Sequence, residues 1–118
     1  MKQAATLLIV KDIKKSKQFY VNVLGLKRIS EHDGRLHFKY GGHLIVMFQG
    51  ESDATTYKHG FDSSSTLVFS VDNLDLKINE LKSHGVIFIH ETPNQNSWGR
   101  YSAFSDPSGI IHELIELA

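Results

Sequence analysis

The chain has 118 residues, of which 22% are charged and 41% are hydrophobic, and it contains no cysteine. This length fits one compact domain with its own core, and it excludes a second full domain and a fold built on disulfides. Thirteen basic and thirteen acidic residues cancel, so the chain lacks the positive field that attracts nucleic acid or anionic membrane. The first apolar run ends at Lys11, too early for a signal peptide or a membrane span, and we expect a cytoplasmic protein.

The first half of the chain predicts a strand, a helix and three more strands. Residues 5–10 are apolar or β-branched, which is typical of a strand. Asp12 then stands where its carboxylate can cap a helix, and Gly25 can end that helix in the left-handed conformation. Three extended runs follow, separated by Asp-Gly and Gly-Gly dipeptides that are typical of hairpin turns: residues 26–30, 35–40 and 43–49.

The same order of elements begins again after the polar segment 51–64. A strand is predicted at residues 66–71, followed by a helix that Asp72 or Asn73 caps and Gly85 ends. Three further strands complete the repeat: residues 86–90, 100–105 and 110–117. The unit βαβββ is therefore predicted twice, and the fold class is α+β.

This repeat predicts how the chain is organised. We expect a single domain, 1–118, made of a first module at 1–50, a linker at 51–64 and a second module at 65–118. Each module is too small to cover its own sheet, so two modules should pair as curved mixed sheets around a cavity, within a chain or between chains. Because unpaired strand edges invite association, we also expect a homodimer.

Three segments spread over nearly the whole chain carry a family likeness. They are residues 10–26, with the helix cap and the Leu-Gly-Leu that follows the helix, residues 71–86, and residues 98–114, with their Asp-Pro-Ser-Gly turn. Together they resemble the vicinal oxygen chelate superfamily, which includes glyoxalase I, bleomycin resistance proteins, fosfomycin resistance proteins and extradiol dioxygenases. The resemblance implies two βαβββ modules around a ligand cavity, but it does not select one reaction.

Metal-using members of that superfamily take their ligands from the first and last strands of each module. Carried onto this sequence, the ligand positions fall on Ala5, Thr66, Val46 (or Phe48 on the same face) and Glu113. Of these, Glu113 alone is a usual metal ligand, whereas catalytic zinc typically has three protein ligands and harder cations have more. The resemblance therefore implies a metal-free member of the bleomycin resistance type, with no cofactor.

The expected function is the sequestration or sensing of a small aromatic or amphipathic molecule. Glu113 is the candidate ligand anchor or general base, because a charge among apolar neighbours needs a partner; the other interpretation ties it to Arg100 or Arg35. The remaining candidate ligand contacts supply apolar area, aromatic rings and polar groups: Trp98, Phe48, Met47, Val46, Thr66, Tyr101, His37 and Arg100.

An enzymatic function is the alternative. It would be a metal-dependent lyase or dioxygenase in which Glu113, His37 and water bind the ion, or a metal-free isomerase with Glu113 as the base. The other histidines do not favour a metal site: His112 points to the opposite face from Glu113, and His84 suits the negative end of a helix. His59 lies in the long joint between the modules and is a candidate lid residue. No nucleophile motif or phosphate-binding loop is present.

Overall fold

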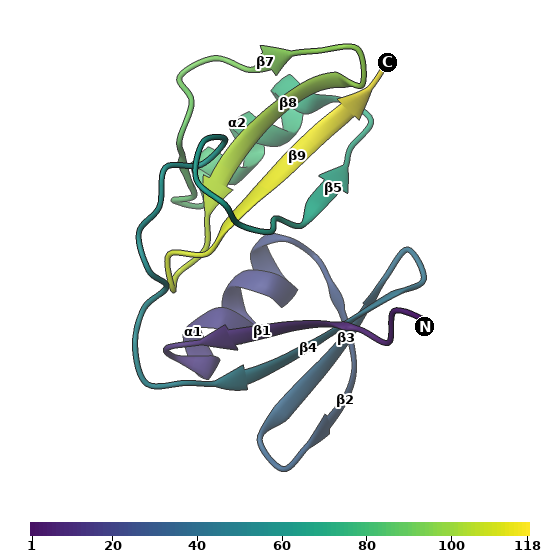
Figure 1. Ribbon diagram of the computed structural model, residues 1–118, viewed down its shortest axis with the longest axis vertical. Helices are drawn as coiled ribbons and strands as arrows, with labels where there is room; N and C mark the ends of the chain where they lie inside the picture. The colour runs from purple at the N-terminus through teal and green to yellow at the C-terminus, as the bar shows by residue number, and fades with distance from the viewer. The chain divides into compact units, whose positions relative to one another are not determined.

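The computed structural model describes residues 1–118 apart from the side chain of Ile29. The chain divides into two compact units, Met1–Ala54 and Thr55–Ala118. Each unit contains one mixed sheet and one helical segment, which confirms the predicted α+β class with two modules (Figure 1). The boundary between the units falls inside the predicted linker 51–64, and residues 55–64 belong to the second unit.

The first unit holds a four-stranded sheet in the order β1-β4-β3-β2. β1 runs parallel to β4, and the other neighbours are antiparallel. The strands agree with the predicted ones to within two residues at each end: β1 is Thr6–Val10, β2 is Lys27–His32, β3 is Arg35–Tyr40 and β4 is His43–Gln49. The two hairpins confirm the Asp-Gly and Gly-Gly turns.

The helical segment of the first unit begins where the sequence predicts but changes its winding. Asp12 caps α1 (Ile13–Lys17), and its Oδ1 accepts hydrogen bonds from the backbone N–H groups of Lys14 and Lys15 at 3.1 and 3.2 Å. From Gln18 the chain continues as the π-helix η1 (Gln18–Val23). This wider turn accompanies the burial of two consecutive aromatic residues, Phe19 and Tyr20, whose ring centroids lie 5.3 Å apart.

The second unit holds a five-stranded sheet in the order β5-β9-β8-β6, with β7 paired to β8. Its strands are β5 (Val68–Ser70), β6 (Ile87–Phe88), β7 (Asn94–Gln95), β8 (Gly99–Ser105) and β9 (Ile111–Leu117). The structure corrects the predictions in two places. β5 and β6 are shorter than residues 66–71 and 86–90, and the short strand β7 lies in a stretch expected to be loop.

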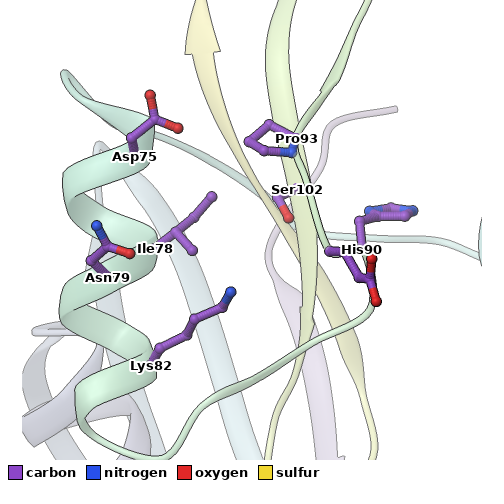
Figure 2. Close-up of a pocket in the computed structure, with 8 residues that line it drawn as sticks. Asp75, Ile78, Asn79, Lys82, His90, Pro93 and Ser102 are labelled. Carbon is purple, nitrogen blue, oxygen red and sulfur yellow. The ribbon is translucent and has the colours of Figure 1, made fainter.

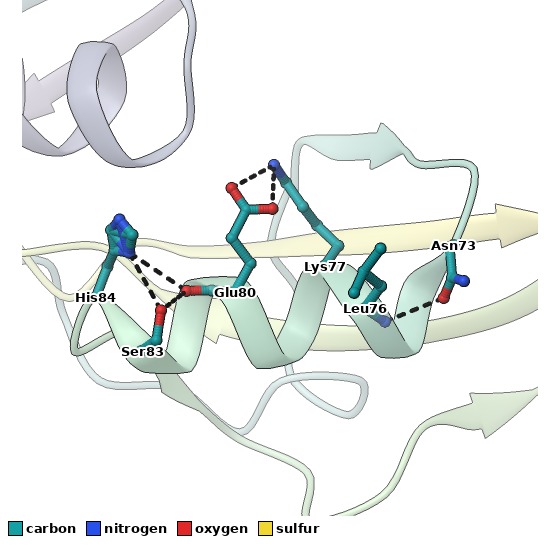
Figure 3. Close-up of polar contacts among 6 residues, drawn as sticks. All are labelled: Asn73, Leu76, Lys77, Glu80, Ser83 and His84. Atoms are coloured by element: carbon teal, nitrogen blue, oxygen red, sulfur yellow. Dashed lines mark hydrogen bonds and ion pairs between the residues drawn. The ribbon is translucent and has the colours of Figure 1, made fainter.

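Helix α2 (Leu74–Ser83) carries polar caps at both ends (Figure 3). Asn73, rather than Asp72, is the N-cap, because its Oδ1 accepts the backbone N–H of Leu76 at 3.0 Å. At the other end His84 is the C-cap, with its Nδ1 3.3 Å from the Glu80 carbonyl oxygen, as expected for a histidine at the negative end of a helix.

Each sheet buries the face that its helix covers. In the first unit the alternating residues of β1, β3 and β4 on that face are almost fully buried: Leu8, Val10, Leu36, Phe38, Ile45 and Met47. In the second unit the buried set on the helix face is Phe69, Ser102, Phe104, His112 and Leu114. Side chains with the opposite parity, such as Leu7 and Ile9 at 53% and 52% exposure, lie on the other face of their sheet. No helix of the described chain is long and apolar enough to cross a membrane.

Candidate functional site

Glu113 lies in the middle of β9, on the sheet face opposite α2. Its neighbours His112 and Leu114 are buried on the helix side, as is expected for adjacent residues of a strand. Glu113 is paired with Ala103 of β8 on one side and with Val68 of β5 on the other. The sheet therefore holds this carboxylate between two neighbouring strands, with 19% of the side chain exposed.

The partner of the Glu113 carboxylate is His59. The distance between Glu113 Oε2 and His59 Nε2 is 2.6 Å, and only 8% of the histidine side chain is exposed. A carboxylate only accepts hydrogen bonds, so Nε2 carries the hydrogen and donates it. The other ring nitrogen, Nδ1, is buried and has no hydrogen-bond partner among the described residues. This contact fixes the segment before β5 to the sheet beside Glu113.

Of the two arginines that the sequence suggested as partners of Glu113, Arg100 binds a different carboxylate, so that suggestion is wrong. Arg100 lies on the helix face, where its guanidinium donates two hydrogen bonds of 3.1 Å to the carboxylate of Asp75 in α2. These bonds lower the pKa of the Asp75 carboxyl. Arg35 belongs to the first unit, and its guanidinium lies 5.3 Å from the centre of the Phe48 ring. Strand parity separates Arg100 from Glu113, because Arg100 is paired with Glu116 and not with Glu113.

The sequence placed His59 in the joint between the modules, but it did not predict the contact of His59 with Glu113. The two residues are 54 positions apart, and no motif links them. The available signal was a histidine within the long polar segment 51–64, the kind of loop that covers a site in many proteins. The interpretation of His59 as a lid residue stays a prediction, to which the structure adds the contact with the β9 carboxylate.

The second unit holds three other predicted contact residues, Tyr101, Thr66 and Trp98. Tyr101, half-buried, has the same parity as Ala103 and so shares that face. Thr66 is half-buried just before β5. Trp98 lies between β7 and β8 with 55% of its surface exposed, and its backbone N–H donates to Asn96 Oδ1 at 2.9 Å. The structure thus places an acid, a phenol and an exposed indole in one unit.

In the first unit the structure brings three predicted contact residues to one face. His37 is paired directly with Val46, and Phe48 follows on the same side of β4. Val46, His37 and Phe48 are half-buried. Met47 is the exception: it points to the helix side and is fully buried, so its expected contact with a ligand is wrong. Adjacent residues of a strand point to opposite faces, so Met47 points away from the face that holds Val46 and Phe48.

The residues at the four ligand positions of the resembled family do not fit a metal centre. Ala5 and Val46 have no donor atoms in their side chains, and Thr66 offers a hydroxyl. The Glu113 carboxylate is already hydrogen-bonded to His59. Among the side chains that the structure describes, no cluster of three or more histidines and carboxylates could hold an ion.

The family model described as Glyoxalase/Bleomycin resistance protein/Dioxygenase superfamily matches residues 2–114. The chain belongs to this superfamily. Its members share the fold described above, and the resemblance found in the three sequence segments is confirmed. A search of curated proteins finds no match.

Several solved structures share the fold of this superfamily member over nearly its whole length. The crystal structure of SMU.1112c has 25% identity and a TM-score of 0.81, covering 98% of this chain and 99% of that one. TnmS3, an antibiotic binding protein from Streptomyces sp. CB03234, has 23% identity and a TM-score of 0.71, covering 99% and 98%. FosX, a fosfomycin resistance protein from Listeria monocytogenes complexed with Mn(II) and sulfate, has 23% identity and a TM-score of 0.78, covering 99% and 90%.

Proposed function

We propose that this chain is a metal-free member of its superfamily that binds a small aromatic or amphipathic molecule, by sequestration or sensing. The observation that carries the proposal is the identity of the residues at the four ligand positions that the family resemblance implies. Two of the four metal-ligand positions have no donor atom, and the remaining carboxylate is hydrogen-bonded to a histidine. A carboxylate held in this way can recognise a ligand without an ion, because it accepts hydrogen bonds from N–H or O–H groups.

The Glu113 carboxylate has capacity for such a contact. His59 occupies Oε2, and within the described chain no hydrogen bond to Oε1 is found. Tyr101 on the same face and the exposed Trp98 supply aromatic surface for the apolar part of a ligand. We include Thr66 of the same unit as a contact residue, and we propose Phe48, Val46 and His37 as contact residues on their shared face of the first unit, since small-molecule sites combine apolar walls with few polar groups. Arg100 is not on the Glu113 face, because its guanidinium binds Asp75 on the opposite face of the sheet.

The solved structures supply support at the level of the fold. TnmS3, an antibiotic binding protein, shares the fold. The FosX structure with Mn(II) represents the other possibility, in which an ion takes part. The donor-poor positions of this chain favour the first kind of function. As parts of the same proposal we retain a cytoplasmic location and a homodimer, in which a second copy could cover an edge such as β6, where Ile87 is 72% exposed.

Trp98 is the sole tryptophan and provides the readout for a direct test. We would titrate the protein with proflavine, a flat aromatic cation whose N–H groups suit a carboxylate, and follow tryptophan fluorescence. The proposal predicts saturable quenching and an affinity that Glu113→Gln weakens about tenfold, the loss of roughly one charge-assisted hydrogen bond.

Glu31→Gln is the matched control, because Glu31 is an exposed carboxylate in the first unit, bound to Arg28 at 3.0 Å. It should leave the affinity for proflavine unchanged. Quenching that requires added Mn(II) or Zn(II) would instead support the metal-dependent lyase or dioxygenase. Equal weakening by both variants would show that net charge, and not the Glu113 face, attracts the probe.

A further inference from the structure

The second unit has a cavity on the helix side of its sheet, away from Glu113. It has a volume of about 170 Å³ and lies between α2, the strand β8 and the chain after β6 (Figure 2). Ser102, at its strand side, is paired with Leu114, which places it on the face opposite Glu113. The cavity is therefore separate from the site of the proposed function. Its size suits a molecule of a few non-hydrogen atoms, because sites for drug-sized ligands are typically about 300–1,000 Å³.

One face of α2 forms the helical wall of this cavity. Asp75, Ile78, Asn79 and Lys82 line it at the i, i+3, i+4, i+7 spacing that aligns side chains along a helix. Figure 2 shows Ile78 and Lys82 extending from the helix toward β8. Pro93 also lines the cavity and, with Ile78, gives it an apolar part. The wall is thus preformed by regular structure.

One polar side chain at the strand side of the cavity, that of Ser102, has no hydrogen-bond partner within the described chain. Ser102 is only 1% exposed and makes no hydrogen bond there through its hydroxyl, which Figure 2 shows turned toward the space between strand and helix. His90 also lines the cavity, but Figure 2 shows its ring turned away from the helix. A ligand that forms a hydrogen bond with this hydroxyl gains affinity from it.

The charges around the cavity are balanced but not all paired. Asp75 is neutralised by the two hydrogen bonds from Arg100. Lys82 has no carboxylate partner in the described chain, and its ammonium lies 5.8 Å from the centre of the Phe88 ring. The exposed Glu91 likewise has no ion pair among the described residues. One positive and one negative group therefore remain available to a ligand.

We propose that this cavity binds a small zwitterion of amino-acid size. Its carboxylate binds Lys82, its ammonium binds Glu91, and its polar atoms satisfy the hydroxyl of Ser102, while a short apolar side chain packs on Ile78 and Pro93. A lone anion would be repelled by Glu91, and a lone cation would be repelled by Lys82. A molecule that carries both charges avoids both penalties.

The test is a titration of the ¹⁵N-labelled full chain with L-alanine, followed by two-dimensional NMR. Acetate and ethylammonium serve as probes that each carry one of the two charges. We expect saturable shifts of the backbone amides near Lys82, His90 and Ser102, with a Kd on the order of 1 mM for alanine and binding at least about tenfold weaker for either single-charge probe.

Variants separate this site from the rest of the molecule. Lys82→Gln and Ser102→Ala should each weaken alanine binding about tenfold, with spectra that show an intact fold. Lys77→Gln is the matched control, since Lys77 lies on the same helix, is paired with Glu80 and does not line the cavity. No saturable shifts, equal binding of acetate, or shifts centred on Glu113 would each overturn the proposal. None of these results bears on the binding of proflavine at Glu113, so the two proposals are tested independently.

Discussion

At the scale of single residues, His112 makes the stability of the fold depend on pH. Its ring lies between Phe69 and Phe104, with centroid distances of 5.8 and 5.7 Å, and burial lowers the pKa of its imidazole from 6.5 to about 4. The unfolded chain therefore takes up this proton at a higher pH than the folded chain does. The contribution to stability is complete above pH 6.5 and is lost as the pH falls toward 4.

This pKa predicts a measurable loss of stability in mild acid. Between pH 7 and pH 5 the free energy of unfolding should fall by about 2 kcal/mol through this residue alone. Urea unfolding at the two pH values measures the change. His112→Phe keeps an aromatic ring in place and removes the titration, so most of the difference between the two pH values should vanish. If the free energy of unfolding of the variant still fell by the same amount between pH 7 and pH 5, other groups would be responsible for the pH dependence.

Substitution of Glu113 distinguishes an effect on ligand affinity from an effect on the stability of the fold. In Glu113→Gln the amide oxygen still accepts the hydrogen bond from His59, so we expect the free energy of unfolding to change by less than about 1 kcal/mol. The affinity for proflavine should fall at the same time. Thermal unfolding and the fluorescence titration on the same samples measure both. A large loss of stability with unchanged binding would make Glu113 a core anchor instead of a ligand contact.

Strand parity predicted the sheet face on which some side chains lie. The alternation of side chains placed His112 and Glu113 on opposite faces, and the structure confirms it. Parity within one strand does not identify which neighbour comes from a distant segment. For this reason the sequence suggested Arg100 as a partner of Glu113, whereas the carboxylate contacts His59.

At the scale of elements, the sequence left the cap of α2 open between Asp72 and Asn73. The structure assigns it to Asn73, so Asn73→Ala should lower the free energy of unfolding by about 1 kcal/mol. Asp72→Ala is the matched control, because Asp72 is exposed and adjacent but does not cap the helix. Urea unfolding of both variants gives the comparison. A larger loss for Asp72→Ala than for Asn73→Ala would contradict the assignment.

The segment before β5 is held by a tight turn and, against the sheet, by the side chain of His59. The carbonyl of Lys58 accepts the backbone N–H groups of Phe61 and Asp62 at 3.0 and 2.9 Å, and His59 bonds to Glu113. His59→Ala removes the contact with the sheet, so the segment should open more often and trypsin should cut after Lys58 roughly tenfold faster.

Limited proteolysis with mass analysis of the fragments measures that cleavage. His84→Ala is a suitable control, because His84 is a helix cap far along the sequence from Lys58. Equal cleavage of the wild type and His59→Ala would show that the turn alone holds the segment. In that case His59 would not act as a lid residue.

Most element boundaries followed from local chemistry. Caps such as Asp12 and dipeptides such as Asp-Gly act within a few residues, so the pattern of the sequence contains them. The π-helix η1 and the short strand β7 did not follow, because both depend on contacts with the rest of the unit. Two residues paired against β8 carry too little local signal to predict a strand.

At the scale of the whole molecule, the repeated order of elements predicted the fold. The βαβββ pattern occurs twice in the sequence, and the structure shows one mixed sheet with a helical segment in each unit. The superfamily match over residues 2–114 agrees with that reasoning. The site was less predictable, since the contact between His59 and Glu113 joins two segments that the fold alone brings together.

The central claim is that this superfamily member recognises its ligand without a metal ion. Metal analysis of the protein purified without chelator tests it most directly, with Glu113→Gln as the comparison. Our account predicts far less than one equivalent of zinc, nickel, manganese or iron per chain, and the same trace amount in the variant. One equivalent of any of these ions in the wild type, lost in Glu113→Gln, would contradict the account.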